Sequence, residues 1–147
     1  MNAQERKTAL NQGNLPPNMW STKTKFRHGQ CDPAGIVYTP EFFNVFNRVV
    51  EEWFDDALRI PYHDIIRNRR KGLGYVTASA TFFTPCEMGD EAEIFVSVAR
   101  IGSKSYQLEL HVMKNGQEAL RGELTTVTTD LDTHRPIEIP ATSKTHC

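Results

Sequence analysis

The sequence lacks the features of disulfide-bonded or metal-bound domains, of secreted proteins and of membrane proteins. Its 147 residues include three cysteines, Cys31, Cys86 and Cys147, an odd number at wide spacing without a Cys-x-x-Cys pair. This spacing predicts neither a disulfide framework nor a metal site. No run approaches the ~20 apolar residues that a membrane span needs, and the polar N-terminal stretch lacks the apolar core of a secretory signal. We therefore expect a cytoplasmic protein without a membrane partner.

The sequence also has no excess of charge of one sign. Lys and Arg number 17 against 18 Asp and Glu, so the formal net charge is −1 and the pI is about 6.5. This balance argues against nucleic acid as a partner bound through bulk charge. With 39% apolar and 24% charged residues, the composition is typical of one globular domain that builds its core without staples.

What the sequence does have is a strong helical pattern in its first half. Over residues 42–58 apolar side chains recur every three or four positions, with polar ones between them. Thr39 is a suitable N-cap, and Pro40 fits the first helical position. The Ile-Pro pair at 60–61 ends the pattern. The spacing predicts one long amphipathic helix with a broad aromatic face.

Beyond this helix the pattern changes to a period of two. A short second helix over residues 62–70 is expected to close at Gly72. Alternating, β-branched and aromatic residues then predict four strands, over residues 75–83, 91–98, 106–113 and 118–129. Asn115-Gly116 is typical of a tight hairpin between the last two strands. One further strand is expected before the long helix, over residues 19–26.

This order of elements predicts an α+β fold. Because strands follow one another through short turns, an antiparallel sheet of five to six strands is expected to wrap around the long central helix. Residues 1–18 are interpreted as a flexible leader, residues 19–140 as a single domain and residues 141–147 as a polar tail.

The segment just before the long helix carries the candidate chemistry. Asp32 precedes a proline, which favours an extended backbone, and Gly35 allows a sharp turn. A carboxylate is thereby held near a helix amino terminus, where unpaired N–H groups and a partial positive charge can receive a developing oxyanion. This pairing can attack an acyl carbonyl. The residues alone leave a second interpretation, in which Asp32 only makes an Asx turn or a cap.

Residues 31–37, Cys-Asp-Pro-Ala-Gly-Ile-Val, resemble the 4-hydroxybenzoyl-CoA thioesterase family of hotdog-fold enzymes. In that family such a run opens the central helix, and the order of elements over residues 19–140 is similar as well. The resemblance implies an acyl-CoA thioesterase, a hydrolase in which coenzyme A is part of the substrate and no cofactor is needed. It also implies a homo-oligomer, a dimer formed through the sheets and commonly a homotetramer, with active sites at the subunit interface.

The same resemblance implies roles for residues around the helix start. Asp32 would attack the thioester carbonyl or activate the water that does, and the sequence leaves both mechanisms open. The backbone N–H that polarises the carbonyl oxygen would be that of Thr39, beside Tyr38, because Pro40 has no N–H. Gly35 would permit close approach of the substrate.

Coenzyme A carries phosphates, so a local cationic patch is expected despite the net charge of −1. The first candidates lie in a turn between two strands, with one more on a neighbouring strand: Arg100, Ser103, Lys104 and Arg121. A denser basic run competes for this role: Arg67, Arg69, Arg70 and Lys71. In the alternative interpretation either cluster is a solvated surface. Candidates to line the channel of the pantetheine arm are Tyr75, Thr77 and Ser79.

Several alternatives stay open at this point. His28 orients Asp32, contacts the substrate or is only a polar turn residue, and Cys31 is a rival nucleophile without a visible base. Glu51 and Glu52 are alternative carboxylates on the polar stripe of the helix. Four aromatic residues could form a slot for an aromatic acid, although they would also suit an aliphatic chain: Tyr38, Phe42, Phe43 and Phe46.

Three other functions compete with acyl-CoA hydrolysis. The first is hydrolysis of an acyl group on acyl carrier protein, which presents the same pantetheine arm. The second is a dehydratase, which would want a His and an acidic residue together. The third is a non-catalytic module that binds an acyl thioester, and the intact Asp32 speaks against it.

Overall fold

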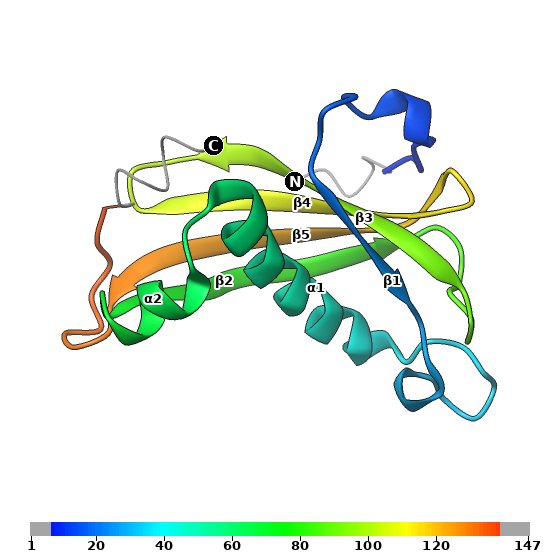
Figure 1. The fold of residues 1–147 in the computed structure, drawn as a ribbon, viewed down its shortest axis with the longest axis horizontal. Helices are drawn as coiled ribbons and strands as arrows, with labels where there is room; N and C mark the ends of the chain where they lie inside the picture. The colour runs from blue at the N-terminus through cyan, green and yellow to red at the C-terminus, as the bar shows by residue number, and fades with distance from the viewer. Residues whose placement is uncertain (1–6, 139–147) are drawn as a thin grey trace.

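A computed structural model describes residues 7–138 of the chain. Five strands form one antiparallel sheet in the order β1-β3-β4-β5-β2. Their bounds are β1 (Ser21–Lys25), β2 (Lys71–Phe82), β3 (Glu91–Ile101), β4 (Ser105–Lys114) and β5 (Gln117–Asp130). The sheet curves around α1 (Thr39–Trp53), and the short α2 (Tyr62–Arg67) lies beside the start of β2 (Figure 1). The predicted α+β fold, an antiparallel sheet around one long helix, is confirmed.

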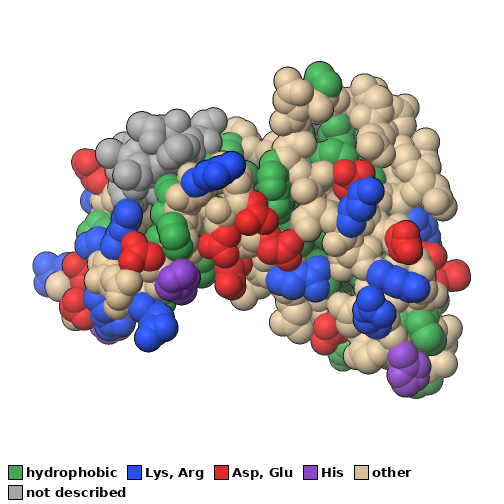
Figure 2. Space-filling model, in the orientation of Figure 1, with side chains coloured by type: hydrophobic (Ala, Val, Ile, Leu, Met, Phe, Trp, Pro, Cys, Tyr) green, Lys and Arg blue, Asp and Glu red, His purple; other side chains and the backbone are tan. Residues whose placement is uncertain are grey.

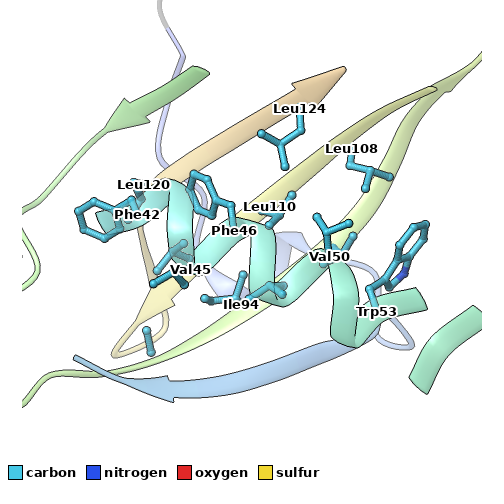
Figure 3. Close-up of a cluster of buried hydrophobic side chains, with 14 of the residues drawn as sticks. Phe42, Val45, Phe46, Val50, Trp53, Ile94, Leu108, Leu110, Leu120 and Leu124 are labelled. Atoms are coloured by element: carbon cyan, nitrogen blue, oxygen red, sulfur yellow. The ribbon is translucent and has the colours of Figure 1, made fainter. Parts of the chain in front are cut away.

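The core lies between α1 and the concave face of the sheet. The apolar residues of α1 that recur every three or four positions are buried: Phe42, Val45, Phe46, Val49, Val50 and Trp53. They face apolar residues that alternate along three strands, among them Ile94, Leu108, Leu110, Leu120 and Leu124 (Figure 3). Full burial of each large side chain stabilises the fold by roughly 1.5–3 kcal/mol. The two sequence periods therefore meet in one core.

One strand residue of this core has no side chain. A Cβ on Gly122 of β5 would lie 2.6 Å from Cε2 of Phe46, inside the contact distance of two carbons. The glycine lets the phenyl ring rest against the backbone of β5, and Phe46 is accordingly only 1% exposed. The depth at which α1 sits in the sheet depends on this contact.

The start of α1 differs by one residue from the prediction. Thr39 is the first residue of the helix, and the N-cap is Tyr38, whose backbone is extended (φ −68°, ψ 128°) and whose side chain makes no capping hydrogen bond. The Tyr38 carbonyl instead accepts the N–H of Glu41 at 2.8 Å. After Trp53 the helix widens into a π-helical turn (Phe54–Leu58), which extends it to the predicted end.

The prediction that Gly72 closes the second helix is wrong. The helix α2 ends at Arg67, and Gly72 is the second residue of β2, paired with Thr129 of β5. A Cβ at Gly72 would collide with the Thr129 side chain, so the glycine serves close packing within the sheet. The chain reverses at Arg70 instead, which has a left-handed φ of 55°. The predicted hairpin is confirmed, because Asn115 and Gly116 both have positive φ, 54° and 77°.

Residues 7–14 lie against the β4–β5 hairpin. The Leu10 carbonyl accepts the N–H of Glu118 at 2.8 Å, and the Gln12 N–H donates to the Gly116 carbonyl at 2.8 Å. The flexibility expected of residues 1–18 stays a prediction, and residues 1–6 and the tail 141–147 lie outside the described part of the chain. None of the helices formed by residues 7–138 is long and apolar enough to span a membrane.

The convex face of the sheet carries a buried acidic residue, Glu118, whose side chain is 0% exposed. Its carboxylate accepts two hydrogen bonds from Arg121, at 2.6 and 2.9 Å, and one from the Leu10 N–H at 3.1 Å. The Nδ1 atom of His111 lies 2.7 Å from Oε2 of the same carboxylate. Burial alone would raise the pKa of Glu118, but the hydrogen bonds from Arg121, His111 and Leu10 outweigh it and hold the pKa below its usual value.

Candidate active site

The Asp32 loop, defined as residues 31–37, folds into a tight turn before α1. Oδ1 of Asp32 accepts the N–H of Ala34 at 2.9 Å and, at 3.4 Å, that of Ile36. The Gly35 N–H returns to the Asp32 carbonyl at 2.9 Å, and Gly35 itself has a φ of 79°, which favours glycine. The Asx turn that the residues alone suggested is therefore present. Within residues 7–138 it leaves Oδ2 of Asp32 without a hydrogen-bond donor.

The helix start offers one backbone donor. The Tyr38 N–H donates to the Gln30 carbonyl at 2.9 Å, the Glu41 N–H is taken by the Tyr38 carbonyl, and Pro40 has no N–H. The Thr39 N–H has no hydrogen-bond partner among the described residues. Because helix dipoles place positive potential at this end, an oxygen atom with developing negative charge would be stabilised there.

A cleft of about 310 Å³ opens beside this donor. Its lining combines the end of the Asp32 loop, the start of α1 and the chain after β2: Ile36, Val37, Thr39, Phe42, Phe82, Phe83, Thr84, Pro85 and Cys86. The rings of Phe42 and Phe82 meet edge to face at the cleft, while Phe42 is supported from behind by Phe26. Apolar and aromatic walls with a few polar groups, here including Thr39, are typical of a site for a small organic ligand.

Only two of the four aromatic residues predicted to form a slot lie at the cleft. Phe42 lines it, and Tyr38 stands beside it with 57% of its surface exposed. Phe46 is buried against Gly122, and Phe43 packs edge to face on Phe46. The sequence analysis missed Phe82 and Phe83, because the pattern marked them as strand residues and only the folded chain brings the end of β2 to the start of α1.

The first predicted phosphate-binding cluster does not meet Asp32 within one subunit. The Asp32 loop contacts residues 86–88, which precede β3, whereas Arg100 lies near the far end of that 11-residue strand. Ser103 and Lys104 follow in the exposed turn to β4. Arg121 stands on the convex face, bound to Glu118 and to the Thr8 carbonyl. Their role in binding coenzyme A stays a prediction.

The competing basic run is already partly neutralised. Arg69 pairs with Asp64 at 3.2 Å, Arg70 with Asp132 at 3.3 Å and Lys71 with Asp130 at 3.9 Å. Arg67 is exposed at the end of α2. All of these residues lie where β2 begins, at the end of the sheet opposite the cleft.

The residues proposed for the pantetheine channel lie on β2, an edge strand. Thr77 and Ser79 are exposed, and the Tyr75 hydroxyl donates to Oδ1 of Asn47 on α1 at 3.0 Å. Burial, and secondarily the charge of Tyr62, raises the pKa of Tyr75 to about 12, so its hydroxyl stays protonated at neutral pH.

The rival catalytic residues are engaged elsewhere or isolated. Glu52 accepts the Thr22 hydroxyl at 2.8 Å and pairs with Arg48 at 3.3 Å, and Glu51 is exposed. The Cys31 thiol donates to the Arg27 carbonyl at 3.4 Å. In the described part of the chain, the side chain of His28 makes no hydrogen bond to Asp32.

Comparison with known proteins places this chain in a family. The model of the thioesterase-like superfamily matches residues 26–144. A 1,4-dihydroxy-2-naphthoyl-CoA hydrolase of Prochlorococcus marinus is 26% identical over 132 residues, which cover 85% of this chain and 86% of that protein.

Two solved structures share the fold. A 4-hydroxybenzoyl-CoA thioesterase superposes with a TM-score of 0.79 at 23% identity, over 87% of this chain and 97% of the other. A 1,4-dihydroxy-2-naphthoyl-CoA thioesterase from Synechocystis gives 0.79 at 19% identity, over 87% and 94%. The chain therefore belongs to the thioesterase-like superfamily and has the hotdog fold that its sequence predicts.

Proposed function

We propose that this thioesterase hydrolyses the thioester of an aromatic acyl-CoA, releasing the free acid and coenzyme A. The observation that carries the proposal is the cleft, where phenyl rings line the walls and the unpaired Thr39 N–H stands at the rim after the Asp32 loop. The relatives named for naphthoyl-CoA and hydroxybenzoyl-CoA substrates support an aromatic acyl group.

In the proposed reaction the acyl ring enters the cleft and the thioester carbonyl oxygen accepts a hydrogen bond from the Thr39 N–H. Oδ2 of Asp32 then either attacks the carbonyl carbon, giving a mixed anhydride that water cleaves, or removes a proton from the water that attacks. The C–S bond breaks, the carbonyl carbon gains an oxygen from water, and the thiolate leaves and takes up a proton. A thiolate is a good leaving group, so a carboxylate and an oxyanion donor suffice.

The edge strand β2 supports the further proposal that the protein is a homodimer. Val76 and Tyr75 are 60% and 38% exposed on this twelve-residue strand, and the unpaired N–H and C=O groups of a long edge strand can pair with a second chain. If β2 pairs antiparallel with its copy, the start of one β2 approaches the end of the other. The partner's basic run at the start of β2 would then approach the cleft.

Such pairing would explain why an active site needs residues from two subunits. On the face shown in Figure 2, basic side chains gather near α2 and again near β1, with acidic ones between them. Pairing of two copies would bring cations from one subunit to a cleft in the other, where coenzyme A phosphates need them. We further propose that two dimers assemble into a tetramer. We also propose that the protein acts in the cytoplasm, because Cys31 and Cys86 form no disulfide bond within residues 7–138.

The test is the release of free coenzyme A thiol from a panel of aromatic and aliphatic acyl-CoAs. We expect turnover of aromatic substrates and a loss of roughly 100-fold or more in kcat for Asp32→Asn. Asp56→Asn is the matched control, because Asp56 is exposed on the π-helical turn.

Equal rates for wild type and Asp32→Asn would overturn the role of Asp32. Turnover of aliphatic substrates only would overturn the aromatic class. No turnover of any acyl-CoA would overturn hydrolysis of coenzyme A thioesters, and would favour a carrier-protein thioester or a binding module.

A further inference from the structure

The position of the Asp32 loop is set by a second loop packed against it. This backing loop, residues 83–90, connects β2 to β3. The Val37 N–H donates to the Cys86 carbonyl at 2.9 Å, and the Met88 N–H donates to the Gly35 carbonyl at 2.8 Å. Ile36 and Glu87 form a β-bridge between these two contacts. The two loops are thus joined like short strands, and a shift of the backing loop would move Asp32.

The backing loop is in turn held by one cation from β4. Nζ of Lys114, in the last residue of that strand, donates to the Pro85 carbonyl at 2.8 Å and to Oδ2 of Asp90 at 3.1 Å. The same Oδ2 accepts the Glu87 N–H at 2.8 Å. A single ammonium group therefore ties Pro85, just before the bridged segment (residues 86–88), to Asp90, two residues after it. Among the side chains of residues 7–138, Lys114 is the one that bonds to both places.

The Lys114–Asp90 ion pair is partly buried. The side chains of Lys114 and Asp90 are 22% and 29% exposed, so solvent screens their attraction less than in a fully exposed pair. The pKa of Asp90 is held below its usual value, chiefly by the Glu87 N–H, with Lys114 adding to this effect against the opposing influence of burial. At neutral pH the clamp is thus a charged carboxylate between an amide and an ammonium group.

The chemistry does not use Lys114 directly. The residue is absent from the lining of the cleft and reaches the Asp32 loop only through Pro85, Asp90 and the bridged segment. Cys86, at the centre of that segment, is 1% exposed, and burial raises the pKa of its thiol to about 11, so the thiol stays protonated. The bridged segment therefore contributes backbone geometry rather than a reactive group.

We infer that Lys114 and Asp90 are positioning residues for catalysis, because together they fix the backing loop on which the Asp32 loop is aligned. This inference rests on the proposed function for its catalytic consequence, but its structural part is independent of any substrate. Removal of the clamp leaves the helix start and the cleft wall formed by Phe42 and Phe82 in place, because neither belongs to the backing loop. It frees the Asp32 loop to sample positions from which the carboxylate cannot attack.

The first test measures the loops themselves by amide hydrogen exchange. Lys114→Met keeps most of the aliphatic stem and removes the charge, and we expect the Val37 and Met88 amides to exchange at least roughly tenfold faster. Amides in the middle of α1 should keep their rates. Lys114→Arg restores a cation and should restore slow exchange. Lys7→Met is the matched control, since Lys7 pairs with Glu123 on the convex face.

The second test measures steady-state kinetics on the acyl-CoA that wild type hydrolyses best. Because misplacement of a reacting group mainly raises the barrier of the chemical step, Lys114→Met should lower kcat roughly tenfold or more and change KM by a smaller factor. Asp90→Asn should behave in the same way. The double variant should lose no more than the worse single variant, because the two residues act as one unit.

The outcomes separate this inference from the proposed function. Unchanged exchange of the Val37 and Met88 amides in Lys114→Met would overturn the clamp whether or not the protein is a thioesterase. Faster exchange with unchanged kcat would overturn its catalytic role. Absence of turnover in wild type would overturn the proposed function and with it the catalytic half of the inference, while the exchange data would still decide the structural half.

Discussion

The rings of Phe42 and Phe82 meet edge to face, with centroids 5.5 Å apart, and join the first turns of α1 to the end of β2. Phe42 is buried, whereas Phe82 is 45% exposed. Both rings line the cleft, but Phe42 is also part of the core, whereas Phe82 is open to solvent. In this wall of the cleft the Phe42 ring is fixed by the surrounding core, and the Phe82 ring is accessible to a ligand.

Substitution of the exposed ring should change substrate preference without unfolding the protein. We expect Phe82→Ala to raise KM for an aromatic acyl-CoA roughly threefold to tenfold, the range that the loss of one aromatic pair predicts. An aliphatic acyl-CoA measured beside it is the control, because it has no ring to pair with Phe82. An equal rise for both substrates would show that Phe82 contributes only bulk, and no change would remove it from the acyl site.

The role of the Thr39 N–H can be tested by deleting that single hydrogen. Thr39→Pro removes the donor at the first helical position, where proline is well tolerated, and Tyr38 already has the extended backbone that precedes a proline. We expect kcat to fall roughly 100- to 1,000-fold, as for other oxyanion donors. Thr39→Ala keeps the N–H and separates it from the side chain. Retention of full kcat by Thr39→Pro, with circular dichroism unchanged, would exclude this donor.

The proposed pairing through β2 predicts the effect of a charge on that edge. Val76→Lys should convert dimers into monomers in sedimentation velocity, because lysine on an edge strand opposes strand addition. Ile101→Lys, at the 43% exposed end of β3, is the matched control and should leave the assembly intact. A variant that keeps the wild-type sedimentation coefficient at every concentration would place the interface elsewhere.

The buried Glu118 cluster predicts how stability depends on pH. The pKa of Glu118 in the folded protein lies below its ordinary value of 4.5, so its charged form favours folding. This contribution is fully present above about pH 4.5 and is lost as the pH falls through the lowered pKa of the folded state. We expect Glu118→Gln to reduce the free energy of unfolding by about 3 kcal/mol near pH 7. The difference from wild type should shrink below pH 4.5.

Urea unfolding at one fixed protein concentration measures this difference, since assembly would otherwise shift the midpoint. Glu109→Gln is the matched control, because its carboxylate lies 3.9 Å from His111 and is 32% exposed. We expect it to cost less than about 1 kcal/mol. A constant gap between wild type and Glu118→Gln from pH 7 to pH 3 would show that Glu118 does not titrate as described.

The sequence predicted the elements of this fold because each has a clear local period. The helix from Thr39 and the four strands after it agree with their predicted ranges to within a few residues. An element boundary was predicted wrongly where one residue type can serve two roles. Gly72 is compatible with a helix end by its type, but its packing against Thr129 across the sheet is tertiary information.

Only the part of the candidate site that is formed by residues close in sequence could be predicted. Asp32, Gly35 and Thr39 lie within eight residues of one another, so the turn and helix start could be foreseen from their order. The backing loop, Phe82 and Lys114 come from distant parts of the chain, and no local pattern marks them. Arg100 and Lys104 were chosen for their charge alone, which carries no information on which end of the sheet they occupy.

The absence of a side chain at Gly122 links the packing of the core to the position of the candidate active site. It therefore limits which residues this position can accept. Any larger residue there would press on the Phe46 ring, so the ring or the helix that carries it would have to shift. Thr39 begins that same helix, so a displacement of the helix would reach the proposed oxyanion donor without altering any residue of the cleft. Variation at a position with no contact to substrate would then be limited by catalysis as well as by folding.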